Sequence, residues 1–214
     1  MRRWQTIPVC GTLCLIVALQ SPSSFGHSAT DYYNQTWFDT SVKWAFTVGV
    51  PASGGFRARV RDGADAWNSL PPAQHFYEVG EVPSYPPYTP CSNLSYQENA
   101  IHYYNMVESL GRTYQCFAGN EMTKFQLAID VRDNWYLGEP TPPPASDSDL
   151  QSTATHEFGH AGGFRGPFSE GHFKGSGELC TLTPYHTMCP FQGPGEGWFR
   201  SLEEHDRHTF DDAY

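Results

Sequence analysis

The sequence predicts an α+β fold in which five strands and three helices enclose one core. Five short stretches rich in β-branched and aromatic residues are separated by glycine- and proline-containing turns, as is typical of strands. Three further segments have helical spacing of apolar residues, and two of them begin with residues that cap helices. Aromatic residues make up 15% of the 214-residue chain and charged residues 17%, so the chain can fill a core and lacks the composition of a disordered protein.

The first predicted helix is the clearest amphipathic segment. It follows a predicted strand at residues 42–48 and ends at Pro71-Pro72, because proline cannot continue a helix. Its charged side chains mostly occupy one face. The opposite face is expected to be buried and consists of Phe56, Val60, Ala64, Trp67 and Leu70.

The remaining strands are predicted at residues 75–79, 99–107, 112–117 and 125–131. A second helix is expected to begin at Ser148, with Gln151 completing a capping box, and to end at Gly162-Gly163. Residues 164–200 form a glycine-rich, irregular carboxy-terminal subdomain. A last helix is expected to begin at Ser201, with Glu204 in a second capping box.

The amino terminus has the layout of a secretory signal peptide. Two arginines precede an apolar run over residues 7–19, and small residues near position 28 would allow cleavage before Ala29. The apolar run is too short to span a bilayer. We expect residues 1–28 to be removed, which leaves a secreted, extracellular protein with a single domain at residues 29–214.

Four cysteines follow the signal peptide, and an even number in an exported chain indicates two disulfides. Three pairings can be drawn, and we favour Cys91–Cys116 with Cys180–Cys189 because each pair lies on its own local segment. A cysteine-rich zinc site is disfavoured because no CxxC spacing occurs.

The formal net charge of −10 makes the chain a poor candidate for binding nucleic acid or anionic membranes. No segment after the signal peptide is apolar enough to span a membrane. We therefore expect a monomer with neither nucleic acid nor membrane as a partner.

Residues 156–160 read His-Glu-Phe-Gly-His, the motif that carries chemistry in this chain. On a helix, residues four apart lie about 40° apart around the axis, one turn along it. His156 and His160 can therefore hold one zinc ion, and Glu157 can reach a water at the metal without competing as a ligand. Zinc lowers the pKa of a bound water to about 7, and Glu157 would act as the general base in peptide hydrolysis.

The chain at this point resembles the metzincin clan of zinc endopeptidases, and most closely the matrixins. Their signature HExxHxxGxxH is matched by His156, Glu157, His160 and Gly163. Thr187-Met188-Cys189-Pro190 is similar to the methionine turn of the family, which implies that Met188 forms an apolar floor beneath the zinc. The resemblance also implies a twisted, mostly parallel five-stranded sheet with three helices and one antiparallel edge strand, here residues 112–117, along which extended substrates lie.

The sequence departs from the signature at position 166, where the third zinc histidine would stand and Gly166 is found. A catalytic zinc normally takes three protein ligands and a water. We predict His172 as the third ligand, because a lengthened turn with glycines at both ends could return it to the metal. Glu170 and His186 are the rivals. Calcium is a further candidate cofactor that no motif supports.

The sequence thus predicts a secreted zinc endopeptidase that acts on a protein or peptide substrate. Two alternatives stay open. The first is a gluzincin-type protease in which Glu203 or Glu204 is the third ligand. The second is a secreted zinc-binding protein without protease activity, for which the missing histidine at position 166 is the only support.

Overall fold

The computed structural model describes residues 36–37, 39, 41–70, 75–87, 98–107, 109–139, 142–164, 187–189 and 192–214. The predicted signal peptide at residues 1–28 lies outside these ranges, as do Cys91, His172, Cys180 and His186. In the part of the chain that is described, no helix is both long and apolar enough to cross a membrane.

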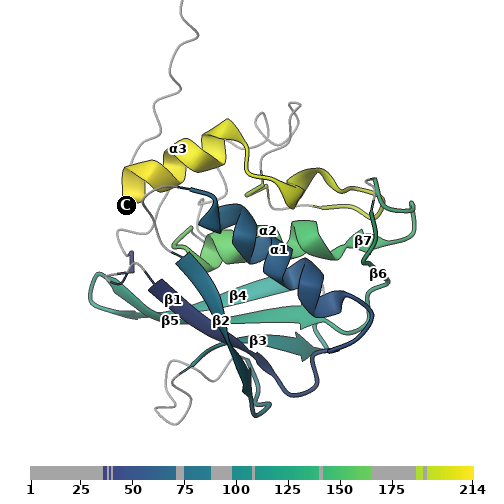
Figure 1. Cartoon of the computed structure of the whole chain (residues 1–214), viewed down its shortest axis with the longest axis horizontal. Helices are drawn as coiled ribbons and strands as arrows, with labels where there is room; N and C mark the ends of the chain where they lie inside the picture. Colours follow the sequence, from purple (N-terminus) through teal and green to yellow (C-terminus); the bar gives the residue numbers. More distant parts are fainter. Residues whose placement is uncertain are drawn as a thin grey trace, which may run out of the picture.

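A five-stranded mixed sheet forms the base of the molecule (Figure 1). The strand order is β2-β1-β3-β5-β4, in which β4 pairs antiparallel with β5 and the other neighbours pair in parallel. The α+β fold and the antiparallel edge strand near residues 112–117 are therefore confirmed. The strands are β1 (Ser41–Thr47), β2 (His75–Val82), β3 (Asn99–Tyr104), β4 (Gly111–Ala118) and β5 (Glu121–Asp130).

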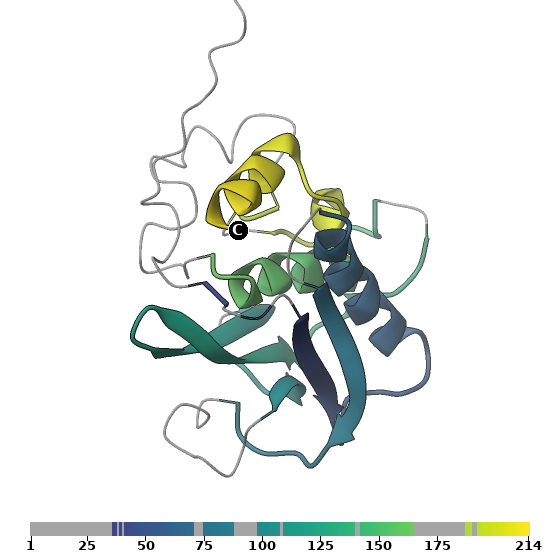
Figure 2. The same cartoon turned by 60° about the vertical axis from the view of Figure 1, so that its left-hand side comes forward.

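The helices lie on one side of this sheet. Helices α1 (Phe56–Asn68) and α2 (Leu150–Ala161) pack on the sheet, and α3 (Glu204–Ala213) lies on the side of α2 away from the strands (Figures 1 and 2). A short helix, η2 (Trp198–Arg200), precedes α3. Two short strands, β6 (Trp135–Tyr136) and β7 (Ser148–Asp149), pair in parallel just before α2.

The apolar face of α2 anchors it in the core between the helices and the sheet. Leu150, Ala154 and Phe158 are fully buried, as their spacing of four residues predicts. The ring of Phe158 lies 5.5 Å from that of Trp44 and 5.2 Å from that of Phe76, in edge-on contacts with β1 and β2. The opposite face of the same helix is thereby turned away from the sheet, and that face carries the histidines of the motif.

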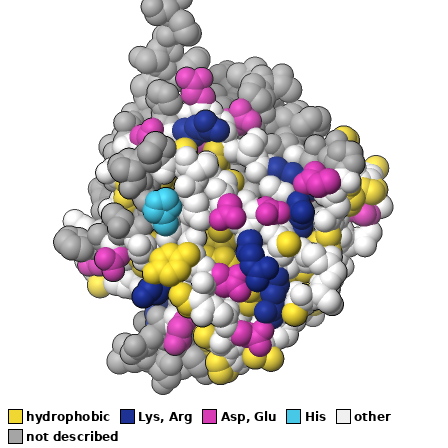
Figure 3. All heavy atoms as spheres, in the orientation of Figure 1, with side chains coloured by type: hydrophobic (Ala, Val, Ile, Leu, Met, Phe, Trp, Pro, Cys, Tyr) yellow, Lys and Arg dark blue, Asp and Glu magenta, His cyan; other side chains and the backbone are white. Residues whose placement is uncertain are grey.

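Helix α1 is fixed to β2 by ion pairs at the surface. Arg57 reaches Glu81 at 2.6 Å and Arg61 reaches Glu78 at 2.6 Å. Acidic and basic side chains are interspersed over this face of the molecule (Figure 3). The pairs are partly exposed, so each contributes little to the free energy of unfolding.

Two helices begin at other residues than the sequence predicts. Helix α2 is capped by Asp149, whose Oδ1 accepts a hydrogen bond from Ser152 N at 2.8 Å, whereas Ser148 belongs to β7. Helix α3 begins at Glu204, after a capping box formed by Glu203 and Asp206, so the predicted start at Ser201 is wrong. In both cases a longer-range contact holds the residue that had been expected to cap: β-pairing holds Ser148, and the Ser201 carbonyl accepts from the Thr187 hydroxyl at 2.8 Å.

Cys116 takes part in a disulfide, and so does Cys189. Cys91 and Cys180 lie outside the described residues, so the favoured pairing of Cys91 with Cys116 and of Cys180 with Cys189 stays a prediction.

Candidate metal and catalytic site

His156 and His160 point their Nε2 atoms at one place. The two atoms lie 3.1 Å apart, and the ring centroids lie 4.8 Å apart, nearly perpendicular to one another. The two residues stand one helical turn apart on α2, on the face turned away from Phe158. The structure thus brings together the two histidines that the motif predicts to act together.

Backbone carbonyls fix the tautomer of both rings. His156 Nδ1 lies 2.8 Å from the Thr187 carbonyl oxygen, and His160 Nδ1 lies 2.9 Å from that of Phe164. A carbonyl oxygen only accepts, so each Nδ1 carries the proton and donates it. In the neutral rings, both Nε2 atoms therefore present lone pairs toward the same point.

Two lone pairs that converge in this way can bind one cation between them. A proton is a poor candidate, because burial lowers the pKa of His156 to about 4, against the weaker opposing effect of its hydrogen bond to Thr187. A metal ion that prefers imidazole nitrogen fits the same place. The carbonyl partners on Nδ1 are the kind of outer contact that orients a metal-binding histidine.

Glu157 lies beside the histidine pair and is 5% exposed. Its Oε2 accepts a hydrogen bond from the Thr113 hydroxyl of β4 at 2.7 Å. Burial raises the pKa of Glu157 to about 7, although the hydrogen bond from Thr113 and the charge of Arg112 act in the other direction. A carboxyl group with a pKa near neutrality can both take up and release a proton at physiological pH.

The turn at Thr187 and Met188 packs against α2 at two points. The Thr187 carbonyl holds His156, and the Met188 sulfur lies so close to Gly159 that a Cβ at position 159 would collide with it. Met188 is fully buried. The structure therefore places Met188 next to the histidine pair, while its role as a floor beneath a metal stays a prediction.

No third metal ligand comes from the described residues. Among them, no group of three or more histidine, cysteine, aspartate or glutamate side chains is arranged to hold a metal ion. Glu203, a candidate of the gluzincin alternative, instead caps α3. His172, Glu170 and His186 lie outside the described ranges, so the choice among them stays a prediction.

The inward face of β4 was not anticipated from the sequence. Thr113 contacts Glu157, and Gln115 donates through Nε2 to the carbonyls of His160 and Phe164. Residues two apart on a strand share a face, and this face points at α2. Polar residues at alternate positions of the predicted strand, Thr113 and Gln115, are the signal that could have revealed it.

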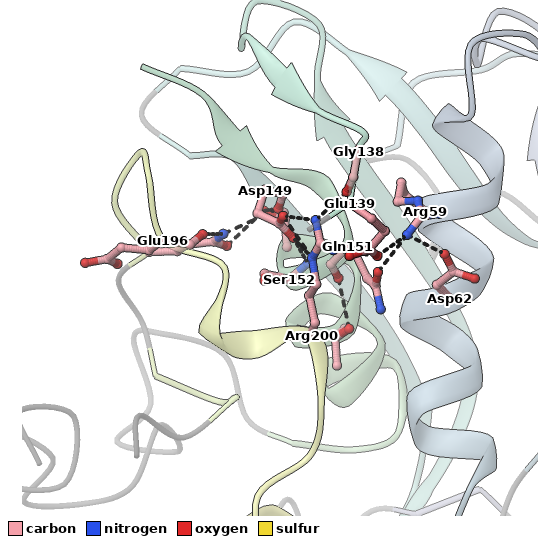
Figure 4. Close-up of polar contacts among 12 residues, drawn as sticks. Arg59, Asp62, Gly138, Glu139, Asp149, Gln151, Ser152, Glu196 and Arg200 are labelled. Atoms are coloured by element: carbon pink, nitrogen blue, oxygen red, sulfur yellow. Dashed lines mark hydrogen bonds and ion pairs between the residues drawn. The ribbon is translucent and has the colours of Figure 1, made fainter. Parts of the chain in front are cut away.

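An ion-pair network, equally unanticipated, holds the start of α2 (Figure 4). Arg200 binds both carboxylate oxygens of the fully buried Asp149, through Nε at 3.1 Å from Oδ1 and through Nη2 at 2.5 Å from Oδ2. Arg200 also reaches Glu139 at 2.7 Å, and Glu139 reaches Arg59 of α1 at 2.8 Å. The network ties α1, α2 and η2 together at the end of α2 away from His160.

No known protein family matches the chain, and no curated protein matches it. Solved structures that match include the structure of myroilysin, with 15% sequence identity over 84% of this chain and 82% of that chain. The TM-score of this superposition is 0.43, a likeness too low to support an argument about function.

Proposed function

We propose that this protein is a zinc-dependent endopeptidase in which His156 and His160 bind one zinc ion and Glu157 is the general base. The observation that carries the proposal is the convergence of the two Nε2 atoms at 3.1 Å, with each Nδ1 hydrogen-bonded to a backbone carbonyl. That arrangement directs two neutral imidazoles at one cation. We assign the third ligand to His172, on the sequence argument alone.

The residues present fit zinc by their chemistry, because imidazole nitrogen is a preferred ligand of this metal. A bound zinc ion would supply a Lewis acid that polarises a peptide carbonyl and lets water act as a nucleophile near neutral pH. Glu157 would accept the proton of the attacking water and then deliver it to the amine that leaves. Its burial next to the histidines and its hydrogen bond to Thr113 support this role.

The substrate that we propose is an extended segment of a protein or peptide. Strand β4 stands at the end of the sheet order, and its inward residues face the motif helix. An extended chain can add to the edge of a sheet through backbone hydrogen bonds, which would bring its peptide bonds past Glu157.

We further propose that the protein is secreted and acts as a monomer. The signal-peptide layout of residues 1–28 supports secretion. The disulfide-bonded state of Cys116 and Cys189 fits an oxidising compartment. Neither nucleic acid nor a membrane is expected as a partner.

The test is to express the full chain in a secreting host and to measure zinc by mass spectrometry alongside hydrolysis of casein. We expect stoichiometric zinc and casein cleavage that stops on chelation and returns when zinc is added back. The variants His156→Ala and His172→Ala should each lose zinc after dialysis, whereas His75→Ala, on the far edge strand, should keep it. Stoichiometric zinc without hydrolysis of casein or of a peptide library would instead favour the zinc-binding protein without protease activity.

A further inference from the structure

Strand β4 approaches the motif helix through three alternate residues, Gly111, Thr113 and Gln115. Each one meets α2: Gly111 lies against the Glu157 side chain, Thr113 binds Glu157, and Gln115 binds the His160 carbonyl. Because side chains alternate along a strand, these three residues form one continuous face. The edge strand β4 thus contacts helix α2 at Glu157 and His160, two residues of the motif.

Gly111 leaves the room that the Glu157 side chain occupies. A Cβ at position 111 would lie 2.7 Å from Glu157 Cγ and 2.9 Å from its Oε1, closer than such contacts normally are. Any larger residue would push the carboxylate out of its place. The backbone of β4 therefore packs closely against one side of the Glu157 side chain.

Thr113 supplies a polar contact to the same glutamate. Its Oγ1 lies 2.7 Å from Glu157 Oε2 and 2.9 Å from the Glu157 backbone carbonyl oxygen. One hydroxyl group is therefore held against both the side chain and the main chain of a single residue. A glutamate side chain has several rotatable bonds, and a donor anchored on a strand selects one orientation among them.

We propose that Thr113 is a positioning residue that holds the Glu157 carboxylate in its working orientation, with Gly111 providing the space. This inference rests on the proposed function, in which Glu157 is the general base. Thr113 acts through Glu157 and itself exchanges no proton with substrate. The hydroxyl is what matters in this role, because the methyl group of Thr113 offers the carboxylate no hydrogen bond.

The test compares Thr113→Val, which keeps the shape but removes the hydroxyl, with Thr113→Ser, which keeps the hydroxyl. Hydrogen bonds to charged groups are strong enough that Thr113→Val should lower kcat on a peptide about 10- to 100-fold, with little change in KM. Thr113→Ser should stay within a few-fold of the parent protein. Zinc content and the midpoint of thermal unfolding should be close to those of the parent in both variants.

The matched control is Thr123→Val, which makes the same chemical change in the same hairpin. Thr123 donates to the Cys116 backbone carbonyl at 3.2 Å and not to a residue of the motif, so kcat should be unchanged. Crystal structures of the parent and of Thr113→Val give a second measurement that needs no activity. We expect the Glu157 carboxylate to be displaced or spread over several orientations in Thr113→Val.

The assignment would be overturned if Thr113→Val kept the kcat of the parent, or if Thr113→Ser were as impaired as Thr113→Val. Loss of zinc in Thr113→Val would also overturn it. An unmoved, well-ordered Glu157 in the crystal structure of Thr113→Val would do the same. A parent protein that binds zinc and cleaves nothing would refute the proposed function alone, and the crystal structures would still decide whether Thr113 orients the Glu157 side chain.

Discussion

The start of helix α2 is held by a charged pair, whereas its end is held by neutral hydrogen-bond donors. At its start, the buried carboxylate of Asp149 caps the helix and binds Arg200 through two oxygens. At its end, neutral donors from distant parts of the chain satisfy the last carbonyls. Trp37 Nε1 donates to Ala161 at 2.7 Å, Tyr214 Oη donates to Gly162 at 2.8 Å, and Gln115 donates to His160.

This difference matters because the end of α2 holds the histidine pair. The last carbonyls of a helix lack partners within the helix and carry partial negative charge. Neutral donors satisfy them without placing a full charge beside the imidazoles. The charged pair at the start of the helix lies about two turns before His156 and three turns before His160. Ionic contacts thus secure the start of α2, and neutral hydrogen bonds secure its end, where the histidine pair lies.

The largest effect is expected at Glu157. The variant Glu157→Gln keeps the shape of the side chain and leaves both histidines in place, so it should retain zinc. Loss of the base should lower kcat about 10²- to 10⁴-fold. Peptide hydrolysis and zinc content measured on the same sample provide the check, and cleavage at the parent rate would show that another group takes the proton.

A large effect on stability is expected at the start of α2. Arg200→Met leaves the buried carboxylate of Asp149 without its ion pair, and removing one partner of a buried pair typically costs about 3–5 kcal/mol. Urea unfolding should show this loss. The matched control is Arg61→Met, which breaks the half-exposed pair with Glu78 and should cost about 0–1 kcal/mol. Equal losses in the two variants would contradict an anchoring role for Asp149 and Arg200.

A smaller effect is expected at the end of α2 from Met188→Leu. The substitution nearly conserves volume, so it should lower the free energy of unfolding by less than about 1.5 kcal/mol. Because Met188 is predicted to lie beneath the metal without binding it, zinc content should stay stoichiometric and activity should fall only modestly. Complete loss of zinc would show instead that Met188 takes part in metal binding.

The smallest effect concerns a histidine in the sheet, away from both ends of α2. His102 is buried, its Nε2 lies 2.5 Å from Gln126 Oε1, and burial lowers its pKa below the ordinary value of 6.5. The unfolded chain therefore takes up a proton at His102 before the folded chain does. The stability that neutral His102 provides is present above pH 6.5 and is lost as pH falls below it.

Urea unfolding of the parent and of His102→Gln at several pH values between neutrality and mild acid would test this. The variant should lose less stability on acidification than the parent does. An identical decline in both proteins would assign the acid sensitivity to other groups.

Much of this arrangement could be predicted from local sequence. The spacing of His156, Glu157 and His160 places them on one helix, and the positions of Leu150 and Phe158 predict which face is buried. The order of strands and helices follows from their patterns. Such features depend on residues a few positions apart, where helix and strand periodicity determines the direction of each side chain.

The contacts that complete the site depend on residues far apart in the chain. Thr113 and Glu157 are separated by 44 positions, and Asp149 and Arg200 by 51. The cap of α2 differs from the prediction for this reason: Ser148 and Asp149 are both good capping residues, and the arginine that favours Asp149, Arg200, comes from η2. The predicted third ligand, His172, lies outside the described residues and remains a prediction from the sequence.

The carbonyl of Thr187 makes the motif depend on where a main-chain segment lies, which a side-chain substitution does not test. His156 depends on a main-chain oxygen 31 residues away, which every amino acid at position 187 would supply. Replacing the side chain leaves this acceptor in place, although it removes the hydrogen bond from the buried Thr187 hydroxyl to the Ser201 carbonyl and so costs stability for a separate reason. Moving the segment would not be tolerated. A backbone cleavage or an inserted residue near position 187 would leave the sequence of α2 unchanged. It would still remove the carbonyl that holds the His156 ring. Protein engineers who graft the motif onto another scaffold would need to bring this stretch of backbone with it.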